Sequence, residues 1–249
     1  MRIVGVIPAR MASSRFPGKP LALIRGQTML EHVYRRTRAC HLLAEVIIAT
    51  CDREIAHAAE SFGARTILTS SSHDRASDRV AEAIAGDTAE IVVMVQGDEP
   101  LVRPEMIEAA VEALLLDATL GCANLATAIR SEDELSDRNT IKVVAGLGGH
   151  ALYFSRQPIP DCSVRSLPTG AHFKQVCVIP FRRHALATFA SLPRGPLEEL
   201  ESIDMLRFLE NGHRVRIVTT DVPTHAVDVP GDVGIVENLM ARHPWTDVS

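Results

Sequence analysis

The chain has 249 residues, which is enough for one well-buried α/β core and short for two independent domains. Hydrophobic residues make up 46% and charged residues 23%, as in ordinary globular proteins, and the formal charge of −5 argues against a general nucleic-acid binder. No apolar run approaches the roughly 20 residues that cross a bilayer, and Met1 leads directly into a strand-like segment. We therefore expect a cytoplasmic single domain over 1–249, with no membrane or nucleic-acid partner.

The N-terminal half alternates short apolar runs with segments of helical period, which predicts βαβ units around a mostly parallel sheet. Strands are predicted at 3–7, 46–49, 67–68 and 91–95, and helices at 28–38, 53–62, 77–84 and 104–115. Thr28 and Glu31 have the spacing of a capping box, and Asp52 is a candidate cap for the second helix.

The second half is less regular. Strands are predicted at 122–128, 142–144, 151–154, 176–181 and 215–218, and helices at 197–209 and 231–242. The part from about 140 to 185 is a candidate smaller lobe. The five cysteines are scattered without the spacing of a zinc site, so we expect them to be reduced.

A loop of small residues follows the first predicted strand and carries Arg10, Arg15 and Lys19. Gly18 can adopt unusual backbone angles there, so the loop can wrap a triphosphate while its three cations neutralise the charge. The loop lacks the spacing of a P-loop. The alternative interpretation is a solvated basic loop without a ligand.

The strongest predicted strand, 91–95, ends in the polar sequence QGDEP, which contains Gln96 and Asp98. A carboxylate at the end of a buried strand is well placed to hold Mg²⁺, which prefers oxygen ligands. Asp228, flanked by apolar residues, is a candidate second ligand. The alternative is that Asp98 caps a turn and Asp228 caps the last helix.

The whole chain resembles the 3-deoxy-manno-octulosonate (KDO) cytidylyltransferases. The resemblance rests on four ordered matches: IPARMASSRFPGKPL from position 7, VQGDEPLV from 95, ALYFSRQPIP from 151 and VDVPGDV from 227. It implies a Rossmann-like nucleotide-diphospho-sugar transferase fold, a small dimerisation lobe and a homodimer. It also implies a Mg²⁺-dependent reaction of CTP with an acidic acceptor that releases pyrophosphate.

The resemblance assigns roles to individual residues. Arg10 and Lys19 would contact the CTP phosphates and, with Asp98, carry catalysis, while Asp98 and Asp228 would hold Mg²⁺ and Gln96 would lie near the acceptor. With Arg15 from the loop itself, the predicted nucleotide-binding residues are Ala9, Arg10, Ser13, Arg15, Lys19, Ser77 and Arg79.

The match weakens on the acceptor side. Where the family commonly reads HLGIYGYR, this chain reads QVCVIPFR, so Gln175 replaces a histidine and Ile179 a tyrosine. Met205 replaces a glutamine, although its thioether cannot reproduce the two-way hydrogen bonding of an amide. We therefore expect an acceptor that is smaller and more anionic than KDO.

A small phosphonate such as phosphonoformate is the concrete candidate, with Arg156, Lys174 and Gln175 joining Gln96 at the acceptor. Drift within a KDO enzyme is the alternative, and a nucleotide-binding module without turnover is an alternative of another class. The segment 161–171 is a candidate for closing over the acceptor.

Overall fold

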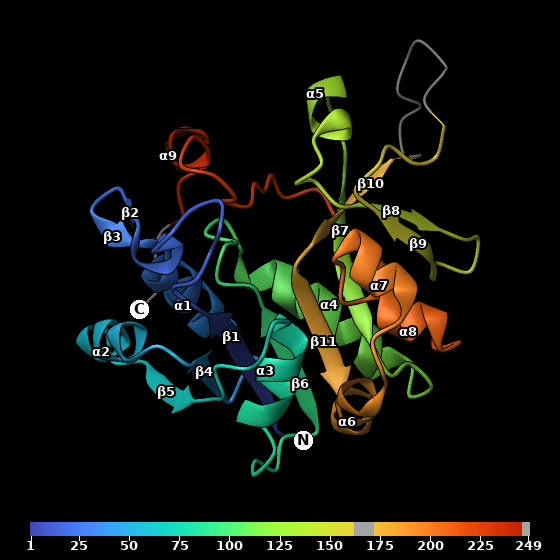
Figure 1. Cartoon of the computed structure of the whole chain (residues 1–249), viewed down its shortest axis with the longest axis horizontal. Coiled ribbons are helices and arrows are strands. Elements are labelled where there is room, and N and C mark those ends of the chain that lie inside the picture. Colours follow the sequence, from blue (N-terminus) through green and yellow to red (C-terminus); the bar gives the residue numbers. More distant parts are fainter. Residues whose placement is uncertain (162–171, 246–249) are drawn as a thin grey trace. The chain divides into compact units, whose positions relative to one another are not determined.

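The computed structural model describes residues 1–161 and 172–245, and the chain divides into two compact units (Figure 1). Unit 1 contains Met1–Glu108 and Pro223–Ser249, and unit 2 contains Ala109–Val222. The expected small lobe at about 140–185 lies within unit 2. Unit 2 is larger than the expected lobe because β7 and β12 belong to the same sheet as the strands of the lobe. The candidate closing segment falls largely on 162–171, outside the described residues.

Unit 1 is built on parallel strands in the order β6-β1-β4-β5, so the βαβ prediction is confirmed. The first strand is central, and Val6 pairs with Ile47 on one side and Met94 on the other. The strands are β1 (Ile3–Ala9), β4 (Glu45–Thr50), β5 (Arg65–Leu68) and β6 (Ile91–Val95), with the short pair β2 (Leu23–Ile24) and β3 (Gln27–Thr28). The helices are η1 (Lys19–Leu21), α1 (Met29–Arg38), α2 (Arg53–Ser61), α3 (Ala76–Ala83) and α9 (Asp232–Arg242), and α4 (Pro104–Leu116) crosses the boundary between the units.

Helix α1 begins as the sequence predicts. The Thr28 side chain accepts a 3.2 Å hydrogen bond from the Glu31 backbone N–H, which is one half of a capping box. The Glu31 carboxylate does not complete the box by reaching back to Thr28, because it accepts instead from Arg35 and Gln27.

The second predicted cap is wrong. Asp52 precedes α2 but makes no side-chain cap hydrogen bond. Its Oδ2 accepts from the backbone N–H of Met11 at 2.8 Å. The carboxylate therefore secures the loop after β1 rather than the start of the helix.

The C-terminal segment returns to unit 1 and packs there through an apolar cluster. Its buried members are Ile24, Met29, Leu101, Val227, Val236 and Met240. Burying these side chains removes apolar area from water and fixes the segment that carries Asp228 beside the turn after β6.

Unit 2 is built on a mixed sheet in the order β12-β7-β10-β8-β9. Only β12 and β7 run parallel, and the other pairs are antiparallel. The strands are β7 (Ala123–Ala128), β8 (Lys142–Ala145), β9 (Ala151–Ser155), β10 (Phe173–Val176), β11 (Val178–Arg182) and β12 (Arg216–Thr220). The helices are α5 (Glu132–Ser136), α6 (Arg183–Ser191), α7 (Pro196–Glu201) and α8 (Leu206–Glu210).

Two predicted elements of unit 2 are interrupted. The strand predicted at 176–181 is two strands that meet at Cys177, and the helix predicted at 197–209 is two helices separated at Ser202, which adopts a left-handed conformation with φ of 55°. Such a residue ends a helix and leaves carbonyl groups without partners within it. The guanidinium of Arg156 satisfies two of these, donating to Glu201 O at 2.6 Å and Ser202 O at 3.2 Å.

A bidentate ion pair lies inside unit 2. Arg207 and Glu198 are 2% and 0% exposed at their side chains, and the guanidinium donates to the two carboxylate oxygens at 2.8 and 2.7 Å. Arg207 also stacks over the ring of Phe189 at 4.3 Å from the ring centroid. The pair therefore joins α7 to α8 in an apolar setting.

Among the described residues, no helix combines the length and the hydrophobicity that spanning a membrane requires. The described cysteines Cys40, Cys51, Cys122 and Cys177 are free, as expected.

Candidate functional site

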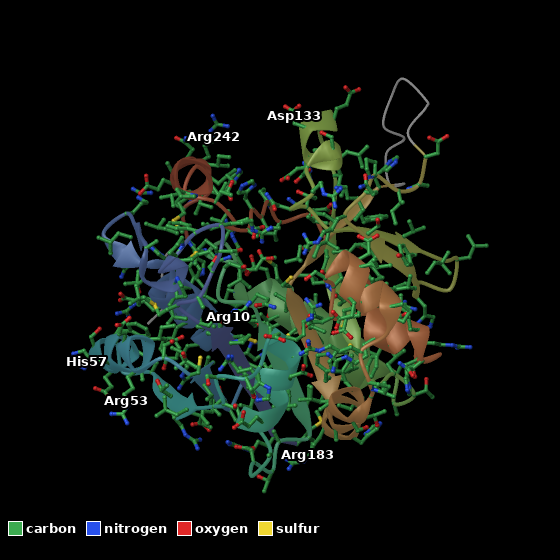
Figure 2. The ribbon with its side chains drawn as sticks, in the orientation of Figure 1. Arg10, Arg53, His57, Asp133, Arg183 and Arg242 are labelled. Atoms are coloured by element: carbon green, nitrogen blue, oxygen red, sulfur yellow. The ribbon has the colours of Figure 1, made fainter. Side chains whose placement is uncertain are left out.

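The loop after β1 starts at the carboxyl end of the central strand of unit 1. Arg10 is exposed at that end (Figure 2). The loop folds back on itself, since the Gly18 N–H donates to Met11 O at 3.2 Å. Gly18 has a φ of 73°, a left-handed conformation that an L-residue adopts only with strain.

Lys19 joins the two carboxylates that the sequence singles out. Its Nζ donates to Asp98 Oδ2 at 2.7 Å and to the carbonyl of Val227 at 2.9 Å, and it lies 3.9 Å from Asp228 Oδ1. Arg15 donates to the same Asp228 oxygen at 2.7 Å. Four of the predicted residues, Arg15, Lys19, Asp98 and Asp228, therefore form one cluster in unit 1.

Two further hydrogen bonds hold the two acidic segments together. The Val227 N–H donates to Asp98 O at 2.9 Å, which ties the segment before Asp228 to the turn after β6. Thr224 donates to the buried carboxylate of Glu99 at 3.1 Å. Gly97 lets the turn after β6 lie close to β1, because a Cβ at this position would meet Pro8 O at 3.1 Å.

The cluster perturbs the protonation of its own members. Burial lowers the pKa of Lys19, but the charge and hydrogen bond of Asp98, with the charge of Asp228, outweigh burial and leave that pKa above its ordinary value. Burial and the charge of Asp98 raise the pKa of Asp228, against the opposing charges of Lys19 and Arg15. The carboxylates thus repel each other, and a further cation near them would relieve the repulsion.

The arrangement fits a magnesium ion. Mg²⁺ commonly binds one or two protein carboxylates and completes its shell with water and substrate phosphate oxygens. In the part of the chain that the structure describes, no group of three or more His, Cys, Asp or Glu side chains could by itself hold a metal. Asp98 and Asp228 have the oxygen donors and the mutual repulsion that such an ion would use.

The alternative roles as caps do not match the contacts. Asp98 places its carboxylate on Lys19, and the turn before α9 is held by Asp232, whose Oδ2 accepts from the N–H groups of Asp228 and Val229 at 2.7 and 2.8 Å. The Asp228 side chain is therefore directed to Arg15 and Lys19 rather than to a helix N-terminus.

The other residues predicted to bind the nucleotide differ in exposure. Ala9 is 7% exposed at the end of β1, and Ser13 is half-buried and accepts from the Phe16 N–H at 3.3 Å. Ser77 and Arg79 are buried on α3, and Arg79 donates to Thr69 Oγ1 at 2.5 Å and to two backbone carbonyls of the preceding loop. Arg79 thus shapes the segment 69–73 from inside.

The residues predicted to bind the acceptor are divided between the units. Gln96 is half-buried in unit 1, and the other three lie in unit 2. Lys174 forms an ion pair with Glu134, and Arg156 also donates to Arg138 O at 2.9 Å. Lys174 thus has a counter-ion, and Arg156 uses its N–H donors on backbone carbonyls, which does not favour a small anionic acceptor.

Two of the substituted positions on the acceptor side are apolar and buried. Ile179 is 2% exposed and Met205 is 0% exposed. Gln175 donates to Asn124 Oδ1 at 2.6 Å, so its amide has a partner on β7. Packing therefore accommodates Ile179 and Met205 at the positions where hydrogen-bonding side chains are replaced, and the Gln175 amide pairs with Asn124.

Sequence reasoning missed two residues that organise the site. Asp52 holds the backbone of Met11, and Glu99 holds the segment at Thr224. Asp52 follows β4 as Asp98 follows β6, so polar residues at the ends of the two strands that flank β1 were a usable signal. Glu99 offered none, because nothing in its local sequence indicates a distant partner.

Comparison with known proteins identifies the family to which the chain belongs. The model of the family described as Cytidylyltransferase matches residues 4–217. The 3-deoxy-manno-octulosonate cytidylyltransferase of Solibacter usitatus is 45% identical over 238 residues, covering 96% of this chain and 94% of the relative. That of Geobacter metallireducens is 42% identical, with coverages of 97% and 99%.

A solved structure of CMP:2-keto-3-deoxy-manno-octonic acid synthetase complexed with CTP superimposes with a TM-score of 0.88, at 37% identity, and covers 97% of this chain and 99% of that one. The fold is therefore the nucleotide-diphospho-sugar transferase version of the Rossmann sheet, as expected, and the chain is a nucleotidyltransferase. It belongs to the cytidylyltransferase family and, within it, to the 3-deoxy-manno-octulosonate cytidylyltransferases.

Proposed function

We propose that this enzyme transfers the cytidylyl group of CTP to 3-deoxy-manno-octulosonate and releases pyrophosphate. The observation that carries the proposal is the cluster of Lys19, Arg15, Asp98 and Asp228, in a chain 42–45% identical to curated enzymes of that name. These comparisons favour the sugar acid over the phosphonate that the altered acceptor segment suggested.

The basic side chains of the loop would bind and neutralise the triphosphate. Lys19 is charged at neutral pH and held at a fixed place by Asp98 and by the Val227 carbonyl. Arg10 is exposed at the mouth of the loop, and Arg15 is tethered to Asp228. Charge that builds on the departing pyrophosphate would be stabilised by these cations without a covalent enzyme intermediate.

Asp98 and Asp228 would hold Mg²⁺. When bound, the ion supplies Lewis-acid polarisation of the α-phosphate and orients the reacting oxygens. The chain's own contribution is to fix the two carboxylates near each other, through the hydrogen bond from Val227 N–H to Asp98 O and the burial of the segment at 227. Ser77 and Arg79 would act indirectly, by shaping the loop 69–73 on the nucleotide side.

A small phosphonate remains the second candidate acceptor because Ile179 and Met205 offer no hydrogen bonds where the family has tyrosine and glutamine. The ion pair of Lys174 with Glu134 and the carbonyl contacts of Arg156 argue against it. In either reading Gln96 and Gln175 are the uncharged polar residues that we assign to the acceptor side.

We also propose that the enzyme is a homodimer that associates through unit 2. Three leucines of this unit, Leu147, Leu152 and Leu200, have exposed fractions of 112%, 64% and 83%. An interface on this unit would cover such side chains, since a contiguous exposed apolar patch marks a surface that a partner covers. The leucines would be buried in the interface.

The test is pyrophosphate release from CTP and Mg²⁺ with KDO, with phosphonoformate or with no acceptor. The proposal expects release with KDO that Asp98→Asn suppresses and the exposed control Glu54→Gln retains. Release with phosphonoformate alone would replace the proposed acceptor by a phosphonate. Saturable CTP binding without release for either acceptor would contradict the proposal.

A further inference from the structure

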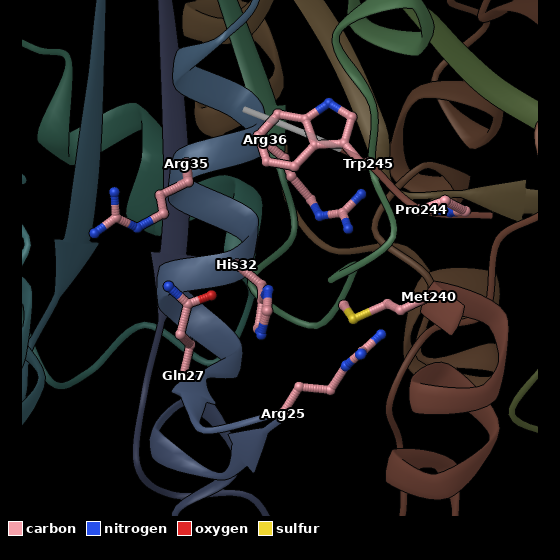
Figure 3. Close-up of a pocket in the computed structure, with 8 residues that line it drawn as sticks. All are labelled: Arg25, Gln27, His32, Arg35, Arg36, Met240, Pro244 and Trp245. Atoms are coloured by element: carbon pink, nitrogen blue, oxygen red, sulfur yellow. The ribbon is translucent and has the colours of Figure 1, made fainter. Parts of the chain in front are cut away.

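A basic pocket lies in unit 1 and contains none of the residues assigned to the reaction. It has a volume of about 410 Å³ (Figure 3). It is lined by Arg25, Gln27, His32, Arg35, Arg36, Met240, Pro244 and Trp245. The pocket therefore combines helix α1 and the short β2–β3 hairpin with the end of α9 and the residues that follow it.

Arg36 is the most unusual member. Arg36 is 4% exposed, and its guanidinium carbon lies 4.8 Å from the ring centroid of Trp245. Nε has no hydrogen-bond partner among the described residues, and Nη1 makes only a 3.5 Å contact with Val102 O. Burial, with the charge of Arg103, lowers the pKa of Arg36 to about 10, so the group is still charged at neutral pH.

A buried guanidinium normally contacts a carboxylate or another anion, because an uncompensated buried charge is costly. The contrast within this chain is Arg207, which is equally buried and is paired in bidentate fashion with Glu198. Among the described residues, Arg36 contacts the aromatic face of Trp245 and makes a long contact with the carbonyl of Val102. It forms no ion pair with a carboxylate there.

Arg25 brings a second cation to the pocket. In Figure 3 its side chain extends from the hairpin toward Met240, on the same side of α1 as Arg36. Its backbone has a φ of 50°, and its N–H donates to Glu237 Oε1 at 2.9 Å, so the residue is held in an uncommon conformation by α9. This conformation directs the side chain into the pocket.

Among the described residues, no carboxylate nearby forms an ion pair with Arg25 or Arg36. Glu31 is paired with Arg35, whose side chain points away from Arg36 in Figure 3. Glu237 accepts from the Arg25 backbone, and Glu105 lies 3.7 Å from Arg103. The space between Arg25 and Arg36 thus carries positive charge that these groups do not neutralise directly.

We propose that this pocket binds a small phosphate-bearing anion, with the phosphoryl group between Arg36 and Arg25 and the remainder against Trp245 and Met240. A planar guanidinium suits the bidentate recognition of phosphate oxygens. A volume of about 410 Å³ is that of a pocket for one small organic molecule. The site is separate from the residues of the proposed reaction, so its test does not depend on the acceptor.

Trp245 is the only tryptophan of the chain and lies in the pocket, so its emission is a local reporter. The experiment titrates inorganic phosphate and glycerol 3-phosphate into the full-length protein, against sodium chloride at matched ionic strength. We expect a saturable change of emission whose apparent affinity falls at least about tenfold in Arg25→Gln, a change of at least about 1.4 kcal/mol. The exposed control Arg53→Gln should show the same saturable change of emission as the wild-type protein. So should Lys19→Met, which alters the triphosphate loop and not this pocket.

A second measurement covers Arg36, because replacing it alters the stack on Trp245 directly. Phosphate should raise the thermal midpoint of the wild-type protein and leave that of Arg36→Gln unchanged. A linear response equal to that of sodium chloride, or one unchanged in Arg25→Gln, would mean that Arg36 and Trp245 only pack against each other, which overturns the proposal. Loss of the response in Lys19→Met would assign the phosphate to the triphosphate loop and overturn it as well.

Discussion

Lys19 donates to Asp98 at 2.7 Å, and the same nitrogen lies 3.9 Å from Asp228, so one cation bridges two acids that are 130 positions apart in the chain. The bridge keeps both carboxylates near one point before any ligand arrives. Since a carboxylate pair without a cation would repel, Lys19 contributes both to the order of the site and to its charge.

Asp98→Ala should abolish turnover with little effect on folding. The carboxylate is partly exposed at the edge of the sheet, and its loss removes the proposed metal ligand and the partner of Lys19 rather than core packing. Removing one electrostatic contact to the reacting groups commonly costs about 10²–10³-fold in rate. Pyrophosphate release measures the loss, and near-normal activity in this variant would refute the metal role.

Asp228→Asn should make stability less dependent on pH. The folded pKa of Asp228 is raised above its ordinary value of 3.8, so the folded state keeps this proton where the unfolded state has lost it. Its contribution to stability is therefore present below the unfolded pKa and declines as pH rises through the folded pKa. Unfolding free energies in metal-free buffer from about pH 4 to about pH 7 should fall less in the variant. An unchanged slope would show that the carboxyl is not perturbed.

Asp52→Ala should weaken CTP binding. The carboxylate holds the Met11 N–H at 2.8 Å and makes no cap hydrogen bond to α2, so its loss should free the loop and leave the helix intact. We expect KM for CTP to rise about tenfold, equivalent to about 1.4 kcal/mol, with an unchanged helical circular-dichroism signal. A loss of helix without a change in KM would restore the role of a cap.

Glu198→Ala should destabilise unit 2 by about 3–5 kcal/mol, because it leaves the guanidinium of Arg207 buried without its counter-ion. The double variant Glu198→Leu with Arg207→Met should recover much of that loss, since apolar residues of similar size can replace a buried ion pair. Chemical denaturation gives both values. Equal losses in the single and double variants would indicate that the charge itself is not the cause.

Leu152→Lys combined with Leu200→Glu should convert the proposed dimer to a monomer. Both side chains are largely exposed in the single chain, so the changes should leave the fold of unit 2 intact. Light scattering after size-exclusion chromatography measures the mass. A wild-type protein that is already monomeric, or a double variant that remains dimeric, would remove unit 2 from the interface.

The sequence by itself determined the parallel sheet of unit 1 and the chemical type of the site. Buried apolar runs such as Ile91–Val95 have one stable environment, a sheet covered on both faces, and polar residues directly after them must then lie at the sheet edge. Arg15, Lys19, Asp98 and Asp228 could therefore be predicted as ligand-binding residues from local pattern and family resemblance. The break of the predicted helix at Ser202 could not be predicted, because the apolar spacing of a helix continues through that position in the sequence.

Only the tertiary structure decided which partner each polar side chain takes. Asp52 and Asp228 both look like helix caps in sequence, yet one holds Met11 and the other Arg15, because segments distant in the chain approach them in the folded protein. Lys174 and Arg156 look like free cations for an anionic acceptor until Glu134 and the carbonyls near Ser202 are placed beside them. Charge and hydrogen-bonding capacity are local properties of a residue, whereas their satisfaction depends on neighbours that only folding supplies.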